Sequence, residues 1–286
     1  MMRSLNNKSH GYQIVKDVTG SAPTKLIERF EVRPGDCGQQ FGKDDCERDR
    51  ERSELSQKNK DIINGSTEWY GWYIFVPKGH KFLGPTKVTL GQFHQSKART
   101  AWMFHNHAGG YWLANQLANK HRFLELLDKK ELTGKWNRIE VNAKWSDEED
   151  GFFKVWVNGK LKCDFVGVTA SANNLYFKYG IYRTYVSRYK NMPLGFWLAK
   201  KLGLPKSQHR PYIQEINLVN REGGDDEDIL RKVMKDIEKH GADITESDIR
   251  LKLDEFQKKL KNGKHPPAHV VYYTLVKRGD SRASIK

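Results

Sequence analysis

The stretch "YFKYGIYR", Tyr176–Arg183, alternates two kinds of side chain and thereby predicts a β-strand with two different faces. One face holds Tyr176, Lys178, Gly180 and Tyr182. The other holds Phe177, Tyr179 and Ile181, a combination typical of a sandwich core. On the first face, the glycine between a cation and a phenol lets a large ligand approach the backbone. We interpret this face as a binding floor.

Composition favours a folded protein with a polyanionic partner. The chain has 286 residues, of which 12% are aromatic, and its formal net charge is +15. The aromatic content argues against a disordered chain. The charge is compatible with nucleic acid, an anionic membrane surface or an acidic polysaccharide. No apolar run is long enough to cross a membrane, so we expect no membrane partner.

Short aromatic strands separated by turns predict an antiparallel two-sheet sandwich. The strand candidates are "EWYGWYIFVPKG", "KVTLGQFHQ", "TAWMFHNH", "KWNRIEVNAKW", "FFKVWVNGKLKCDF", "YFKYGIYRTYV" and "PYIQEINLV", together with the earlier "KLIERFEVRPGD", which alternates and then turns. An Asn-Gly pair, Asn158–Gly159, predicts a tight hairpin turn within the fifth of them. Helical interruptions are expected near "HRFLELLDKKEL" and "PLGFWLAKKLG".

The composition changes after Glu222, and we therefore divide the chain into residues 1–222 and 223–286. In the second part, "DDEDILRKVMKDIEKHG" and "TESDIRLKLDEFQKKLKNG" predict two amphipathic helices, the second capped by Thr245 or Ser247. The last apolar stretch, "AHVVYYTLVKRG", could be a strand that returns to the main body. We expect a C-terminal helical appendage on an all-β domain.

The three cysteines are too few for a disulfide scaffold. Cys37 and Cys46 bracket a short polar loop that one disulfide would close, whereas Cys163 is expected to be a free thiol. The charged run "KDDCERDRER" in this region is expected to be a solvated loop whose arginines extend a basic rim. No secretory signal is visible, but the expected disulfide favours a secreted or periplasmic protein.

Three segments place polar residues at every second position of a strand and would supply a cation, an amide, an imidazole and a phenol. The residues are Arg52 and Glu54 in "RSELS", Gln92 and His94 in "GQFHQ", and Lys178 and Tyr182 in "YFKYGIYR". Taken singly, each has an ordinary structural explanation, such as a cross-strand ion pair. His105 and His107 also share a face, but without an obvious third metal ligand we favour a structural or substrate-lining role.

Together, these segments resemble the signature strands of jelly-roll polysaccharide lyases. Alginate lyases of family seven carry related motifs in the same order as "RSEL" at Arg52–Leu55, "QFH" at Gln92–His94 and "YFKYGIYR" at Tyr176–Arg183. The flanking "FEVRPGDC", "GWYIFVP", "GKWNRIEVNAKWS" and "VWVNGK" resemble the heparin-lyase-I-like group, which includes the glucuronan lyases of family twenty. The resemblance extends over residues 30–219. It implies a concanavalin-like β-jelly roll and the eliminative cleavage of a polyuronate, which we expect to be β-1,4-glucuronan.

The resemblance also implies roles for individual residues. Gln92, Arg52 and His94 would neutralise the uronate carboxylate, and Tyr182 would transfer protons as base and acid. For sugars in which the proton and the leaving oxygen lie on opposite sides of the ring, His94 would be the base instead. Cations near Tyr182 are expected to favour its phenolate. The residues expected to bind substrate are Glu54, Tyr176, Lys178, Arg183 and Arg188.

We expect no required cofactor, although relatives in the heparin-lyase-like group often carry a structural calcium ion; no metal ligands can be named from this sequence. The expected partner is an anionic polysaccharide, and the protein is expected to be a monomer. Alginate and glycosaminoglycans are the alternative substrates. A non-catalytic carbohydrate-binding module would need the aromatic floor but not Gln92, His94 and Tyr182 together. A nucleic-acid-binding protein fits the charge but has no recognised motif here.

Overall fold

The computed structural model divides the chain into two compact units. The sandwich unit comprises Met1–Phe82, Lys87–Thr184 and Ala268–Lys286, and the helical unit comprises Leu83–Thr86 and Tyr185–Pro267. The structure describes residues 2–4, 8–33, 35–40, 43–45, 47–57, 65–80, 82–84, 86–96, 98–118, 122–171, 174–186, 194–195, 197–221, 226–261 and 268–285.

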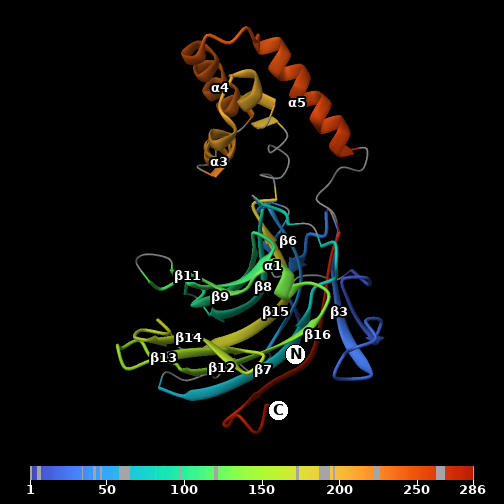
Figure 1. Ribbon diagram of the computed structural model, residues 1–286, viewed down its shortest axis with the longest axis vertical. Helices are drawn as coiled ribbons and strands as arrows, with labels where there is room; N and C mark the ends of the chain where they lie inside the picture. Colours follow the sequence, from blue (N-terminus) through green and yellow to red (C-terminus); the bar gives the residue numbers. More distant parts are fainter. Residues whose placement is uncertain are drawn as a thin grey trace. The chain divides into compact units, whose positions relative to one another are not determined.

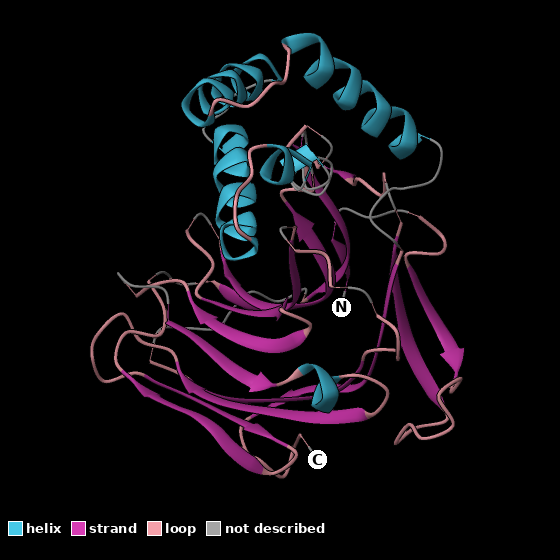
Figure 2. Cartoon of the chain, turned by 45° about the horizontal axis from the view of Figure 1, so that its top comes forward, coloured by secondary structure: helices cyan, strands magenta, loops and turns pink. Residues whose placement is uncertain are grey.

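The sandwich unit consists of two antiparallel sheets of seven strands each, which confirms the predicted fold class (Figures 1 and 2). The first, the site sheet, contains in spatial order β1 (Met2–Ser4), β6 (Arg50–Ser56), β15 (Leu175–Thr184), β8 (Lys87–Gln95), β9 (Trp102–His107), β10 (Gly110–Asn115) and β11 (Arg122–Leu127). The second, the outer sheet, contains β14 (Lys160–Val166), β13 (Phe152–Val157), β12 (Trp136–Lys144), β7 (Thr67–Phe75), β16 (His269–Gly279), β3 (Leu26–Val32) and β2 (Tyr12–Lys16). A small hairpin pairs β4 (Gln39–Gln40) with β5 (Lys43–Asp44).

Aromatic side chains fill the space between the two sheets. Phe177 of β15 lies 4.9 Å from Phe93 of β8 and 5.0 Å from Trp72 of β7, measured between ring centroids. These rings come from alternate positions of strands in both sheets, as the period of two requires. The predicted core face of the Tyr176–Arg183 strand is therefore confirmed.

Local turn chemistry also follows the sequence. Asn158 and Gly159 both have positive φ, 50° and 81°, and join β13 to β14 as a two-residue hairpin loop. The expected helix near "HRFLELLDKKEL" is wrong for its first half, because β11 forms there and pairs with β10. Only α1 (Lys129–Leu132) is helical, and it begins with a capping box at Asp128.

The C-terminal stretch returns to the sandwich, so the boundary predicted after residue 222 needs correction. Strand β16 pairs with β3 on one side and β7 on the other, near the middle of the outer sheet. The sandwich unit instead gives way to the helical unit after Thr184. The helices are thus an insertion between two strands of the sandwich unit and not a terminal appendage.

The helical unit has an apolar core of its own. It contains α3 (Lys206–Arg221), α4 (Asp226–His240) and α5 (Glu246–Lys261), together with the helical residues 197–201. Thr245 caps α5 as predicted, because its hydroxyl accepts a hydrogen bond from the Asp248 backbone. The strand expected over "PYIQEINLV" is wrong: Tyr212 and Ile216, one helical turn apart, are buried in this core. No helix in the described part of the chain is long and apolar enough to span a membrane.

Candidate active site

Strands β6, β15 and β8 are neighbours in the site sheet, and they bring the three sequence segments together. Tyr182 lies opposite Arg52 of β6, and Lys178 lies opposite Gln92 of β8. Tyr176 lies opposite His94, and the two rings are 5.2 Å apart. The predicted residues of these segments therefore share one face of the sheet, which we call the site face.

Gly180 bends the middle of this face. Its φ is +125°, and a Cβ atom built on it would lie 2.3 Å from the carbonyl oxygen of Ser53 on β6. The register between β15 and β8 shifts between Tyr179 and Tyr182. A glycine is needed because no other residue fits either the backbone conformation or the close approach of β6.

Glu54 is the common partner of three other site residues. It accepts from Lys178 Nζ at 2.9 Å, from Arg52 Nη1 at 3.3 Å and from Gln92 Nε2 at 2.6 Å. Burial alone would raise the pKa of this carboxyl group, but the charges of Lys178 and Arg52 and its hydrogen bonds outweigh burial and lower it. Glu54 therefore remains ionised and fixes the positions of the amide and both cations.

A second buried carboxylate, Asp45, holds Arg52 from the other side. Its two oxygens accept from Arg52 Nε at 2.5 Å and from Nη2 at 2.7 Å, and Asp45 is 2% exposed. This bidentate pair corrects the expectation that the whole "KDDCERDRER" run is a solvated loop. The sequence does not show which of Asp44 and Asp45 pairs with Arg52. Arg52 is seven residues after Asp45, and the contact depends on the turn between them.

Tyr182 lies directly over the guanidinium of Arg52, which is 4.2 Å from the centre of its ring. The expected depression of its pKa is wrong. Burial raises the pKa of the phenol, and the charges of Arg52 and Arg50, which lower it, only partly offset this effect. The resting form of Tyr182 is therefore the neutral phenol.

His94 is a neutral imidazole at neutral pH. Burial and, second, the charge of Lys178 lower its pKa to about 4. The charges of Glu54 and Arg52 act on both His94 and Tyr182, so the buried ionic cluster is close to both the imidazole and the phenol. Burial also raises the pKa of the half-buried Tyr176 next to His94.

Arg183 does not reach the site face, which corrects its expected role in substrate binding. Its side chain is completely buried, and Nη2 pairs with Glu51 at 2.8 Å on the opposite face of the sheet. Arg188, the other arginine expected to bind substrate, lies outside the described residues.

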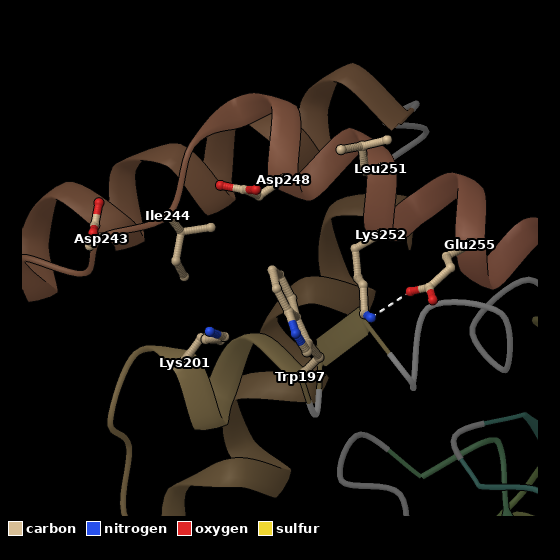
Figure 3. A pocket seen from close by; sticks show the side chains of 8 residues that line it. All are labelled: Trp197, Lys201, Asp243, Ile244, Asp248, Leu251, Lys252 and Glu255. Carbon is tan, nitrogen blue, oxygen red and sulfur yellow. Dashed lines mark ion pairs between the residues drawn. The ribbon is translucent and has the colours of Figure 1, made fainter.

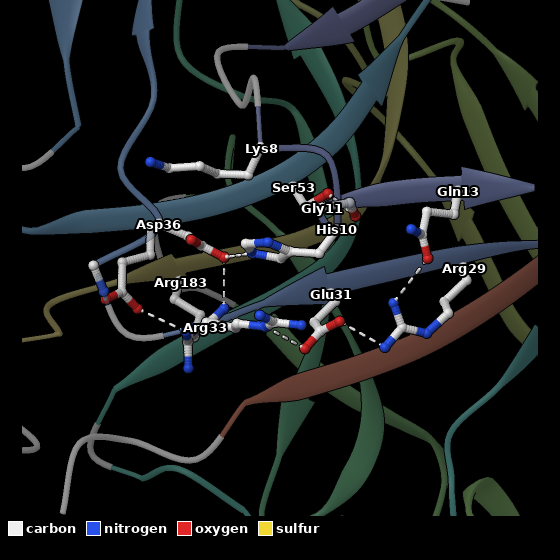
Figure 4. Close-up of polar contacts among 12 residues, drawn as sticks. Lys8, His10, Gly11, Gln13, Arg29, Glu31, Arg33, Asp36, Ser53 and Arg183 are labelled. Carbon is white, nitrogen blue, oxygen red and sulfur yellow. Dashed lines mark hydrogen bonds and ion pairs between the residues drawn. The ribbon is translucent and has the colours of Figure 1, made fainter. Parts of the chain in front are cut away.

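Figure 4 shows Arg183 within a polar network that ties the chain before β6 to the sandwich. His10 pairs with Asp36 at 2.8 Å, and Asp36 also accepts from the Arg33 backbone at 2.7 Å. The Arg52 backbone donates in turn to the Asp36 carbonyl at 3.1 Å. This network fixes the start of β6, on which Arg52 and Glu54 stand.

His105 and His107 lie on β9, one strand beyond β8. His105 is buried, and its Nδ1 is 3.1 Å from the Thr89 hydroxyl; burial and, second, the charge of Lys87 lower its pKa to about 3. Its ring stacks against Phe123, whereas His107 is exposed. In the described ranges, no group of three or more His, Cys, Asp or Glu side chains could hold a metal ion.

A separate cavity of about 450 Å³ lies within the helical unit (Figure 3). Its lining residues are Trp197, Lys201, Asp243, Ile244, Asp248, Leu251, Lys252 and Glu255. The lining holds more carboxylates than cations, and Lys252 is already paired with Glu255 at 2.5 Å. This charge balance does not suit a polyanion, so the site face remains the candidate active site.

Where the structure describes the cysteines, their bonding state agrees with the prediction from the sequence. Cys37 is disulfide-bonded and Cys163 is free. The expected partner of Cys37, Cys46, lies outside the described residues.

A known structure shares this architecture. An endo-β-1,4-glucuronan lyase from the fungus Trichoderma reesei matches with a TM-score of 0.54 and 13% identity, over 99% of this chain and 92% of that one. Alginate lyase AlgAT5 of polysaccharide lyase family 7 matches with a TM-score of 0.39 and 17% identity, over 61% and 71% of the two chains. At these identities, the first match shows the fold alone.

Sequence comparison identifies the family of the chain. No curated protein matches the chain. A family model for the ATPase inhibitor subunit zeta matches residues 180–262, a minority of the chain that includes the helices of the helical unit. The polysaccharide lyase family model matches residues 2–207, which include all the strands of the site face and most of the chain. The chain therefore belongs to the polysaccharide lyase family.

Proposed function

We propose that the protein cleaves an acidic polyuronate by β-elimination, with β-1,4-glucuronan as the preferred substrate. The observation that carries this proposal is the arrangement on the site face, where a phenol, an amide and an imidazole lie next to a buried ionic cluster. The similarity of the fold to an endo-β-1,4-glucuronan lyase supports the choice of polymer.

The reaction needs a proton to move between two positions of one sugar. The bond between C5 and its hydrogen breaks, its electron pair forms the double bond between C4 and C5, and the bond between C4 and O4 breaks. The leaving O4 takes up a proton. In glucuronate, the C5 hydrogen and O4 lie on the same side of the ring, so one group can serve both.

Tyr182 is the proposed proton-transferring residue. The reactive form is the phenolate, which takes the C5 proton and, as the phenol so formed, gives that proton to O4. Burial disfavours this form by raising the pKa of Tyr182, and Arg52 against the ring partly offsets that effect. Gln92 is held by Glu54 through one N–H of its amide, which leaves its other N–H for the negative charge that develops on the uronate carboxylate. His94, neutral at pH 7, can donate there in the same way.

We further propose that the protein acts outside the cytosol and requires no cofactor for elimination. The disulfide at Cys37 supports export, because disulfides persist in oxidising compartments.

A panel of acidic polysaccharides tests the substrate. Purified protein is incubated with glucuronan, polymannuronate, polyguluronate and heparin, and ultraviolet absorbance of the unsaturated product is followed. Glucuronan should give the highest initial rate. Product from none of the polymers, by protein shown to be folded, would refute the activity, and faster cleavage of alginate would correct the substrate.

A further inference from the structure

Two arginines of β6 lie against the ring of Tyr182, but they differ in what else they contact. Arg52 is 4.2 Å from the ring centre and Arg50 is 6.0 Å from it. Their spacing of two residues places them on the same face of the strand. Arg50 is the one residue of β6 that is not buried.

Arg52 is poorly placed to receive a third carboxylate. Asp45 takes its Nε and Nη2, Glu54 takes its Nη1, and its side chain is only 7% exposed. With Lys178, these residues form a cluster of two cations and two anions that has no net charge. A uronate carboxylate approaching Arg52 would meet repulsion from Asp45 and Glu54 that offsets much of the attraction.

Both arginines are charged, but only Arg50 has a partly exposed side chain and a charge that no described carboxylate compensates. Among the described residues, no carboxylate lies within ion-pair distance of its side chain, which is half-buried. Its backbone is fixed by a hydrogen bond from its N–H to the Asp45 carbonyl at 2.8 Å. Through Thr184 of β15, its position is continuous with Lys87 of β8 in one cross-strand row.

We propose that Arg50 is the substrate-binding residue that pairs with a uronate carboxylate next to Tyr182, and that Asp45 is a positioning residue that holds Arg52 against the ring of Tyr182. The inference rests on the proposed function, because it takes a polyuronate as the ligand. Arg50, which is partly exposed, thus binds the carboxylate, and Arg52, which is buried, stabilises the phenolate form of Tyr182.

Arg50→Gln tests the proposal, with Arg48→Gln as the matched control. Arg48 is an exposed arginine two residues upstream, so the control removes the same charge from the same segment. Binding of glucuronan oligosaccharides is measured by calorimetry in the inactive Tyr182→Phe background. Arg50→Gln should weaken binding by about tenfold to a hundredfold, the range for a charge-assisted hydrogen bond. Arg48→Gln should change it less than about threefold, because exposed charges are screened.

Two further comparisons separate charge recognition from a general structural effect. Arg50→Lys should recover part of the affinity, and carboxyl-reduced oligosaccharide should bind equally well whether residue 50 is arginine or glutamine. In the active protein, Arg50→Gln should raise KM by the same factor with a smaller change in kcat, whereas Asp45→Asn should lower kcat with a smaller change in KM.

Equal binding by the Arg50→Gln and Arg48→Gln proteins would overturn the inference, as would an equal loss of affinity for the carboxyl-reduced ligand. These outcomes are independent of the proposed activity. Absence of elimination in the wild-type protein would refute the lyase reaction, while the binding comparison would still decide the role of Arg50.

Discussion

The two faces of β15 show how one strand can serve stability on one side and chemistry on the other. Phe177 and Tyr179 point between the sheets and pack against aromatic rings of both. Lys178 and Tyr182 point to the site face and join a cluster of buried charges. Burying charge costs free energy unless every group is paired, whereas burying rings is favourable. The contrast predicts that changes on the core face alter stability and that changes on the site face alter turnover.

Gly180→Ala should break both faces at once and have the largest effect. The added methyl group would lie 2.3 Å from the Ser53 carbonyl oxygen, and the φ of +125° is strained for alanine. We expect loss of the cooperative unfolding transition and of activity, measured by circular dichroism and product absorbance. As a control, Gly159→Ala in the exposed hairpin turn, where nothing lies within 4 Å of the added carbon, should remain folded. A stable Gly180→Ala protein would contradict the close approach of β6.

Tyr182→Phe should isolate the chemistry of the site face. The ring and its contact with Arg52 remain, so the stability should change little, while loss of the proton-transferring hydroxyl should slow elimination about a hundredfold to ten-thousandfold. Its matched control is Tyr179→Phe on the core face, where the hydroxyl donates to Glu28 at 3.0 Å. That variant should lose stability but keep its rate per folded molecule. Equal rates for the two variants would refute the proposed role of Tyr182.

Phe177→Ala should act on the core face alone. Removal of this ring leaves a cavity among Phe93, Trp72 and Tyr70, and large-to-small changes of this kind cost about 3–5 kcal/mol in unfolding free energy. Denaturant titration measures the loss, and kcat at a temperature where the protein is folded measures the chemistry. A much larger fall in kcat than in folded fraction would show that the two faces are not independent.

Much of this division could be predicted from the sequence, because a period of two assigns side chains to faces without knowledge of the fold. The same alternation places Arg183 with Phe177, Tyr179 and Ile181, so its position on the core face was predictable in principle. The pairing of Arg52 with Asp45 was not predictable, because Asp45 reaches Arg52 through a turn with no characteristic spacing. Nor does periodicity tell which strands a segment will pair with, which is why β16 appears in the sequence as a returning strand of unknown position.

Acid should lower the unfolding free energy through the buried histidines, by less than Phe177→Ala does. His105 on the site sheet is the clearest case. Its pKa is lowered by burial to about 3, whereas an unfolded histidine titrates near pH 6.5. The neutral form is therefore favoured in the folded state, so this contribution to stability is complete above about pH 6.5 and is lost as the pH falls toward 3. Between pH 6.5 and 5.5, the unfolding free energy should drop by roughly 1 kcal/mol through this residue.

Urea titrations at the two pH values should show a smaller drop for His105→Gln, whose side chain does not titrate. They should show an unchanged drop for His107→Gln, at the exposed position of the same strand. If all three proteins lost the same amount, the acid sensitivity would come from other groups, and the buried imidazole on the site sheet would contribute no measurable pH dependence.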